Sequence, residues 1–348
     1  MIWEVARASL AYVRDTIVIT RGQHADLLDA LIFTATLDAN MTPVNRDRAL
    51  DVLFGGVDVS APDALRRRVS MNGVAQSLRL PFETVRRRLS AMARAGLVSI
   101  DSDGVVVPRD AVTSAAYMAE QRARYDRGRR FYGTLKALNA LDGGEAAPAA
   151  TAPEPPVRAA NRALSEYTLR ACNDLIALTG DMISSRVLLE LALASTRGLD
   201  ADRLAAWTRD PAGVGRPIRV AALSQPMEIS DETVRRRLHD LAARGFCRRG
   251  PGGLVATAPA ALGPRLAALV EANRGNVQRL FVRLRQLGVL AAWDREMAEP
   301  RAPAAPRAAD HDVADHDVAD HDRAETISAL LPPRLIATTP RRQHQGHP

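Results

Sequence analysis

Arginines in two identical short segments are the side chains of this sequence whose type and spacing suggest chemistry. The seven residues Glu83–Leu89 recur without change as Glu232–Leu238, at a spacing of 149 residues. Each copy contains three consecutive arginines. An arginine that a helix presents to the major groove can donate two hydrogen bonds to O6 and N7 of guanine. The repeated arginines therefore predict contact with double-stranded DNA.

The helical phase of these segments separates inward from outward side chains. At about 100° per residue, Val85, Leu89 and Met92 share one face, which we expect to be buried. Arg87 lies nearly opposite that face, and a threonine near each helix start can contact phosphate. The residues expected to contact DNA on the two helices are Thr84, Arg86, Arg87, Ser90 and Arg94 in the first copy and Thr233, Arg235, Arg236 and His239 in the second.

Two further pairs of charged residues have more than one interpretation. Arg88 and Arg237 lie at the edge of the buried face, where an arginine can contact phosphate or form a salt bridge at the rim of the core. Glu83 and Glu232 can each pair with the arginine four residues later. They can also accept a hydrogen bond from N4 of cytosine. The intrahelical pair is the favoured interpretation.

The flanks of the repeated segments predict the elements that position these arginines. In the first copy, a short helix is expected over 72–78, followed by a tight connection at Pro81. The arginine helix is expected over 82–95 and ends at Gly96, a common C-terminal residue. An Asp-Gly pair at 103–104 then predicts a hairpin turn. Helix, turn, helix and a two-stranded wing is the order of elements in a winged helix-turn-helix.

The two predicted wings differ in charge. The first carries Asp101 and Asp103, which phosphate repels. The second carries Arg248 and Arg249 beside a glycine-rich turn, and both suit contact with the DNA backbone or the minor groove. We therefore expect the second wing to make a DNA contact that the first one lacks.

The likeness between the copies extends along most of the chain, which indicates an internal repeat. The predicted fold class is mainly α with small β-hairpin wings, as two tandem winged helix-turn-helix domains with flanking long helices. The first half is expected to span 1–141 and the second 159–292. Their cores are expected over 48–108 and 186–258.

Two segments outside the halves lack hydrophobic periodicity. Residues 142–158 are rich in proline, alanine and glycine and predict a flexible linker. Residues 293–348 predict a disordered tail, in which His311, His316 and His321 stand among six aspartates with a period of five. Aspartate and histidine at short spacing can bind a divalent metal. A period of five turns successive histidines to different helix faces, so no metal site is predicted.

Composition limits the function further. The 348 residues carry a formal charge of +7, and Lys136 is the single lysine among 47 basic residues. Cys172 and Cys247 have neither zinc-site spacing nor a disulfide framework. The sequence contains no phosphate-binding loop, dinucleotide-binding motif or nucleophile elbow, so no enzyme activity and no cofactor are predicted. We expect a cytoplasmic protein without a membrane partner, because there is no signal peptide and no apolar stretch of ~20 residues.

The stretch from Glu83 to Val98, ETVRRRLSAMARAGLV, resembles the recognition helix and wing entry of bacterial winged-helix regulators of the MarR and GntR families. The resemblance covers about 40 residues in each half. It implies DNA binding and transcriptional control. The chain departs from MarR-type proteins, which have one such unit and form homodimers, and it has no separate effector domain of the GntR type.

Together these features predict a sequence-specific DNA-binding transcriptional regulator with two recognition helices in an intrachain pseudo-dimer. The helices would reach successive major grooves, ~34 Å apart, on an imperfect inverted repeat. The alternatives are a plasmid-type replication initiator with tandem winged helices, or a winged-helix protein-interaction module, which the acidic first wing would suit. A homodimer with four winged domains stays open, as does a small-molecule effector.

Overall fold

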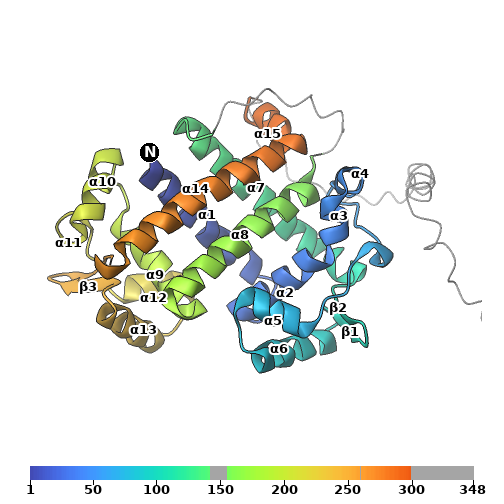
Figure 1. The fold of residues 1–348 in the computed structure, drawn as a ribbon, viewed down its shortest axis with the longest axis horizontal. Coiled ribbons are helices and arrows are strands. Elements are labelled where there is room, and N and C mark those ends of the chain that lie inside the picture. The colour runs from blue at the N-terminus through green and yellow to red at the C-terminus, as the bar shows by residue number, and fades with distance from the viewer. Residues whose placement is uncertain (142–154, 259, 299–348) are drawn as a thin grey trace, which may run out of the picture. The chain divides into compact units, whose positions relative to one another are not determined.

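The computed structural model describes residues 1–141, 155–258 and 260–298. Within these ranges the chain forms fifteen α-helices and two antiparallel two-stranded sheets (Figure 1). A mainly helical fold with two small β-hairpins is therefore confirmed. None of the helices in the described ranges has the length and apolar content to cross a membrane. We use first half for residues 1–141 and second half for residues 155–298.

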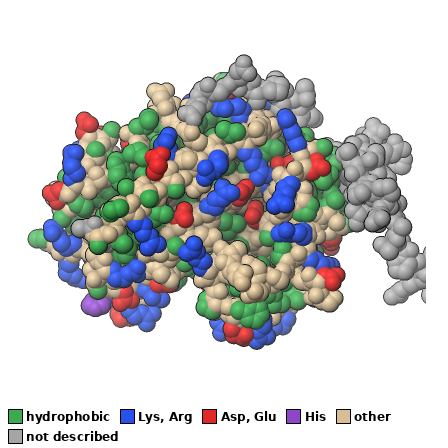
Figure 2. All heavy atoms as spheres, viewed as in Figure 1, with side chains coloured by type: hydrophobic (Ala, Val, Ile, Leu, Met, Phe, Trp, Pro, Cys, Tyr) green, Lys and Arg blue, Asp and Glu red, His purple; other side chains and the backbone are tan. Residues whose placement is uncertain are grey.

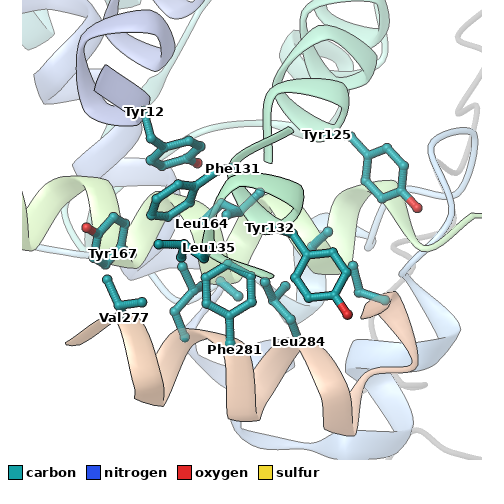
Figure 3. Packing of buried hydrophobic residues seen from close by; sticks show 14 of the residues in the cluster. Tyr12, Tyr125, Phe131, Tyr132, Leu135, Leu164, Tyr167, Val277, Phe281 and Leu284 are labelled. Carbon is teal, nitrogen blue, oxygen red and sulfur yellow. The ribbon is translucent and has the colours of Figure 1, made fainter. Parts of the chain in front are cut away.

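Four long helices enclose the largest apolar cluster of the described chain. Aromatic residues dominate this cluster (Figure 3). The rings of Tyr12 and Phe131 stack with their centroids 4.7 Å apart, an offset arrangement that aromatic pairs favour. Each half contributes two of the helices, which are α1 (Ile2–Arg21), α7 (Ala115–Ala137), α8 (Val157–Thr179) and α14 (Gly263–Gln286).

The other elements of the first half surround a second apolar cluster. The Asp26 side chain caps the first of these helices by accepting a hydrogen bond from the Asp29 N–H, which satisfies a free donor at the helix start. The elements are α2 (Leu27–Asn40), α3 (Thr42–Arg46), α4 (Arg48–Leu53), η1 (Asp63–Leu65), α5 (Met71–Leu78), α6 (Phe82–Arg94), β1 (Ser99–Asp101), β2 (Gly104–Val106) and η2 (Arg109–Val112).

The other elements of the second half surround a third apolar cluster. Asp181 caps the helix that corresponds to α2, in the same way as Asp26. The elements are α9 (Met182–Ser195), α10 (Ala201–Arg209), α11 (Pro211–Val214), α12 (Ala221–Met227), α13 (Asp231–Ala243), β3 (Cys247–Gly250), β4 (Gly253–Ala256) and η3 (Ala260–Leu262). Helix α15 (Val289–Ala298) instead adds apolar side chains to the central cluster.

Unusual backbone conformations recur in the two halves at the spacing of 149 residues. Arg79 and Glu228 end α5 and α12 in the left-handed region, with φ of 54° and 53°. Gly104 and Gly253 have positive φ, and a Cβ atom at either position would collide with the backbone of the residue that pairs with the hairpin. Only glycine fits such a position without strain. The two segments therefore share their local backbone path as well as their sequence.

Each half also connects its hairpin to the end of its 14-residue helix in the same way. The Asn40 side-chain oxygen accepts a hydrogen bond from the Val107 N–H at 2.9 Å. The Ser195 hydroxyl accepts one from the Ala256 N–H at 3.2 Å. Both contacts join residues that correspond between the halves, because α2 and α9 correspond at a spacing of 155 residues, from Leu27 to Met182.

The first helix of each half packs against the other half. Helix α8 adds Leu169 and Ile176 to the apolar cluster of the first half, and the Asn173 amide donates to the Ser77 carbonyl at 2.8 Å. In the reciprocal contact, the guanidinium of Arg21 on α1 donates to the Met227 carbonyl at 3.2 Å. This exchange joins the halves through buried side chains as well as through the chain itself.

Two expected boundaries need correction. The segment predicted as a linker over 142–158 ends earlier than expected, because α8 begins at Val157 and that side chain is buried; residues 142–154 lie outside the described ranges. The tail predicted over 293–348 begins later, because Trp293 on α15 is fully buried against Tyr125 and Tyr132. The Asp/His repeat lies outside the described ranges.

Candidate nucleic-acid interface

Helices α6 and α13 lie at the same lower edge in Figure 1. Each buries three apolar side chains, Val85, Leu89 and Met92 on α6 and Val234, Leu238 and Leu241 on α13. The predicted helical phase is therefore confirmed for both. Burial of such a side chain contributes about 1.5–3 kcal/mol, so the inner face fixes which residues point outward. Figure 2 shows arginine side chains, with acidic ones among them, on the outer surface at both helices.

The structure leaves most of the expected DNA contacts of the first half accessible. Arg87 and Arg94 are exposed on the face of α6 opposite its buried residues, and Arg86 is exposed on the flank of that helix. Thr84 and Ser90 are half-buried on the flanks of that helix. The hydroxyl of Thr84 stands in the first turn, where the free N–H groups of a helix also favour an anion.

The second half presents a similar set. Arg235, Arg236 and His239 are exposed on α13. Arg248 and Arg249 are exposed on β3. Half-buried Thr233 accepts a hydrogen bond from the Ser230 hydroxyl at 2.9 Å, and the same hydroxyl caps the helix by accepting from the Thr233 N–H. The Thr233 hydroxyl proton is left for another acceptor.

The expected pairing of the glutamates with the arginines four residues later is wrong in the first half. Glu83 accepts two hydrogen bonds from Arg86, three residues later, at 2.6 and 2.9 Å. These hydrogen bonds lower the pKa of the Glu83 carboxyl, so it stays ionised. In the second half Asp231, rather than Glu232, pairs with Arg235, at 3.5 Å. Residues three and four apart are both neighbours on a helix. The first half uses a spacing of three, and the second half uses a spacing of four that starts from Asp231.

Among the three arginines of each repeated segment, this pairing leaves one without a carboxylate partner among the described residues. Arg87 and Arg236 form no ion pair there. They occupy corresponding positions and point away from the buried face. A guanidinium with all its donors available is the group that can bind guanine through two hydrogen bonds.

The edge arginines form salt bridges at the rim of each core. Arg88 contacts Asp26 at 2.5 Å and Asp29 at 3.1 Å. Arg237 contacts Asp181 at 3.3 Å. In both halves the arginine joins the central part of α6 or α13 to the N-terminal cap of α2 or α9, so one of the two interpretations drawn from the sequence is confirmed.

The three consecutive arginines Arg66, Arg67 and Arg68 have different surroundings in the structure. Arg66 is buried and donates to the Ser60 hydroxyl at 3.0 Å. Arg68 pairs with Asp101 of the first wing at 2.6 Å, which offsets part of that wing's negative charge. Arg67 is exposed.

Two exposed arginines, one near the hairpin of each half, were not among the DNA contacts predicted from the sequence. Arg67 and Arg216 are both exposed, and they correspond at the spacing of 149 residues. Each donates its backbone N–H to the last residue of α2 or α9, at 2.9 Å. The signal in the sequence was the constant spacing, which matches these two arginines although their neighbours differ.

The described residues offer no alternative chemical centre on this surface. No group of three histidine, cysteine or carboxylate side chains within the described ranges is arranged to hold a metal ion. Cys247 is buried, as expected for a small apolar residue, and burial raises the pKa of its thiol to about 11. Comparisons with protein-family models, with curated proteins and with solved structures give no significant match for this chain.

Proposed function

We propose that this protein is a sequence-specific regulator of transcription that binds double-stranded DNA through α6 and α13. In this proposal each half contains a winged helix-turn-helix unit, with α5 and α6 or α12 and α13 as its two helices. The hairpins β1–β2 and β3–β4 are the wings. The two units arose by internal duplication and act as a pseudo-dimer within one chain.

The observation that carries the proposal is the matched presentation of Arg87 and Arg236. Both arginines lie in the identical seven-residue segment, on the exposed face of a helix, without a carboxylate partner among the described residues. A residue in the left-handed conformation, Arg79 or Glu228, stands at the corresponding position before α6 and before α13. A hairpin follows each of the two helices. Chance similarity of composition does not account for two helices that expose corresponding arginines and are flanked by the same unusual backbone conformations.

The central helices support the pseudo-dimer part of the proposal. Helices α1, α7, α8 and α14 share one apolar cluster to which both halves contribute. An assembly held in this way keeps two DNA-reading helices at a defined separation without a partner subunit. Dimeric helix-turn-helix proteins bind half-sites about 34–36 Å apart for the same geometric reason.

Differences between the two helices predict an imperfect inverted repeat as the binding site. Ser90 corresponds to His239, and Arg94 corresponds to Ala243. These positions point outward and would face different bases. Base pairs opposite Arg87 and Arg236 should therefore agree between the half-sites, and the flanking base pairs should differ.

Genome-wide mapping of bound sites in the native host, followed by footprinting on the purified protein, tests the proposal. The expected result is protection of one inverted repeat per chain at promoters. Protection of directly repeated origin sequences would favour a replication initiator instead. Absence of binding to any duplex at low salt would contradict DNA binding and favour a protein-interaction module.

A further inference from the structure

Two cavities occupy equivalent places, one in each half, between the central helices and the peripheral elements. The first has a volume of about 60 Å³ and the second about 420 Å³. Their walls correspond residue by residue at spacings of 155 for α2 and α9 and 149 for α7 and α14. Leu37 and Tyr117 line the first cavity where Ala192 and Leu266 line the second.

Several polar or charged side chains of the first cavity have apolar counterparts in the second. Asp38 and Glu120 of the first cavity correspond to Leu193 and Leu269 of the second. Buried Arg66 also lines the first cavity. Its counterpart Gly215 has no side chain to place in the second.

The second cavity contains a few polar groups at defined positions. The Tyr167 hydroxyl donates to the Asn273 side-chain oxygen at 2.9 Å, and the Asn273 amide donates to the Ser9 hydroxyl at 3.1 Å. Figure 3 shows the Tyr167 hydroxyl pointing away from Phe131 and Leu135 of the central cluster. A volume of this size, with apolar walls and few polar groups, is typical of sites for small molecules.

The charged groups of the second cavity disfavour an anionic ligand, and its mainly apolar walls favour an uncharged one. The guanidinium of Arg7 donates to the Thr196 and Leu199 carbonyls, at 3.1 and 2.6 Å, so it is already engaged with the backbone. Asp174 also lines the cavity, and burial raises the pKa of its carboxyl. That carboxylate would repel an anion.

We propose that the second half binds one uncharged, mainly apolar small molecule, and that the first half has no equivalent site. The first cavity is too small and too polar for such a molecule, whereas the second has the volume and the apolar walls.

A molecule bound in this cavity would change the position of α13 and so affect DNA binding; this consequence rests on the proposed function. Phe246, which follows α13, and residues 256–258, at and just after the end of β4, line one side of the cavity. Helices α1 and α14 of the central group line the other side. A ligand therefore contacts both the unit that carries α13 and the scaffold that sets its position, and only one of the two DNA-reading helices responds.

Titration of the full-length chain with Nile red, a neutral dye with a carbonyl acceptor, tests the site without DNA. The expected result is a shift of emission to shorter wavelength that saturates at one dye per chain. Ala192→Phe, which fills the cavity from α9, should weaken binding at least tenfold.

A matched control places the same side chain outside the cavity. Ala268 on α14 is exposed and does not line the cavity, so Ala268→Phe should bind the dye like the unmodified protein. Circular dichroism and thermal unfolding of each variant establish that it is folded. Equal dye binding by folded Ala192→Phe, or no saturable binding by the unmodified chain, would overturn the proposed site.

DNA titrations with and without saturating dye separate this proposal from the proposed function. A dye-dependent change in DNA affinity that Ala192→Phe abolishes supports both the site and its coupling to α13. Saturable dye binding with unchanged DNA affinity supports the site and contradicts the coupling. Saturable dye binding by a chain that binds no duplex supports the site and contradicts DNA binding.

Discussion

Positions 87 and 236 correspond in the two halves and both hold an exposed arginine, whereas positions 120 and 269 correspond and hold a buried glutamate and a leucine. The halves thus agree on the surface that carries α6 and α13 and differ in the interior behind it. Agreement on the surface is what reading two related DNA half-sites requires. The difference in the interior shows that a repeated scaffold can keep the same surface in both copies while the cavity of one copy differs in size and polarity from that of the other.

The largest expected effect concerns the buried carboxyl of the first cavity. Burial raises the pKa of Glu120 from 4.5 to about 7. The folded chain therefore holds this proton to higher pH than the unfolded chain does. Stability from Glu120 is present below pH 4.5 and is lost as the pH rises through 7, by up to about 3 kcal/mol. Glu120→Gln should remove this loss, as measured by urea unfolding between pH 4.5 and pH 8.

The matching control is Leu269→Gln in the second half, which adds the same amide where no carboxyl was present. Its pH dependence should follow that of the unmodified chain. His24 acts in the opposite direction, because burial lowers its pKa to about 4, so the comparison between variants isolates Glu120. A pH dependence that Glu120→Gln leaves unchanged would contradict a buried, protonated Glu120.

The next largest effect tests whether α6 and α13 read bases equally. Arg87→Ala and Arg236→Ala should each weaken binding to the specific site by about 1–3 kcal/mol. Each should relax base preference in one half-site only, as measured by selection from randomised duplexes. Arg130→Ala, at an exposed position on α7 outside the repeated segments, should bind normally. Uniform weakening on all sequences would mark the two arginines as phosphate contacts instead.

A smaller effect distinguishes the wings. Replacing Arg248 and Arg249 together by alanine should reduce the slope of log affinity against log salt by about 1.8, since each phosphate contact contributes about 0.9. Asp103→Ala in the first wing should leave that slope unchanged, because no favourable phosphate contact is expected there. The measurement is fluorescence anisotropy on one duplex over a range of salt concentrations. An unchanged slope in the arginine variant would contradict a DNA contact by the second wing.

The sequence predicted the surface of each half better than the interior between them. The inward face of α6 followed from the period of Val85, Leu89 and Met92, because helical phase depends on local sequence. The partner of Glu83 did not follow, since two arginines lie within its reach. The open cavity beside Ala192 did not follow either, because it depends on how α1 packs against the second half, which no local pattern determines. Trp293 was missed because a short helix after a long one gives little periodic signal.

The smallest expected effect asks whether the two rim salt bridges are equivalent. Arg88 contacts two carboxylates, one of them on the largely buried Asp29, and Arg237 contacts one partly exposed carboxylate. Pairs near the surface contribute about 0.2–1 kcal/mol each. Arg88→Ala should therefore lower the free energy of unfolding by about 1 kcal/mol. Arg237→Ala should lower it by a few tenths of a kcal/mol. Equal losses in urea unfolding at neutral pH would mean that the second carboxylate adds nothing, and that the halves are held alike at this rim.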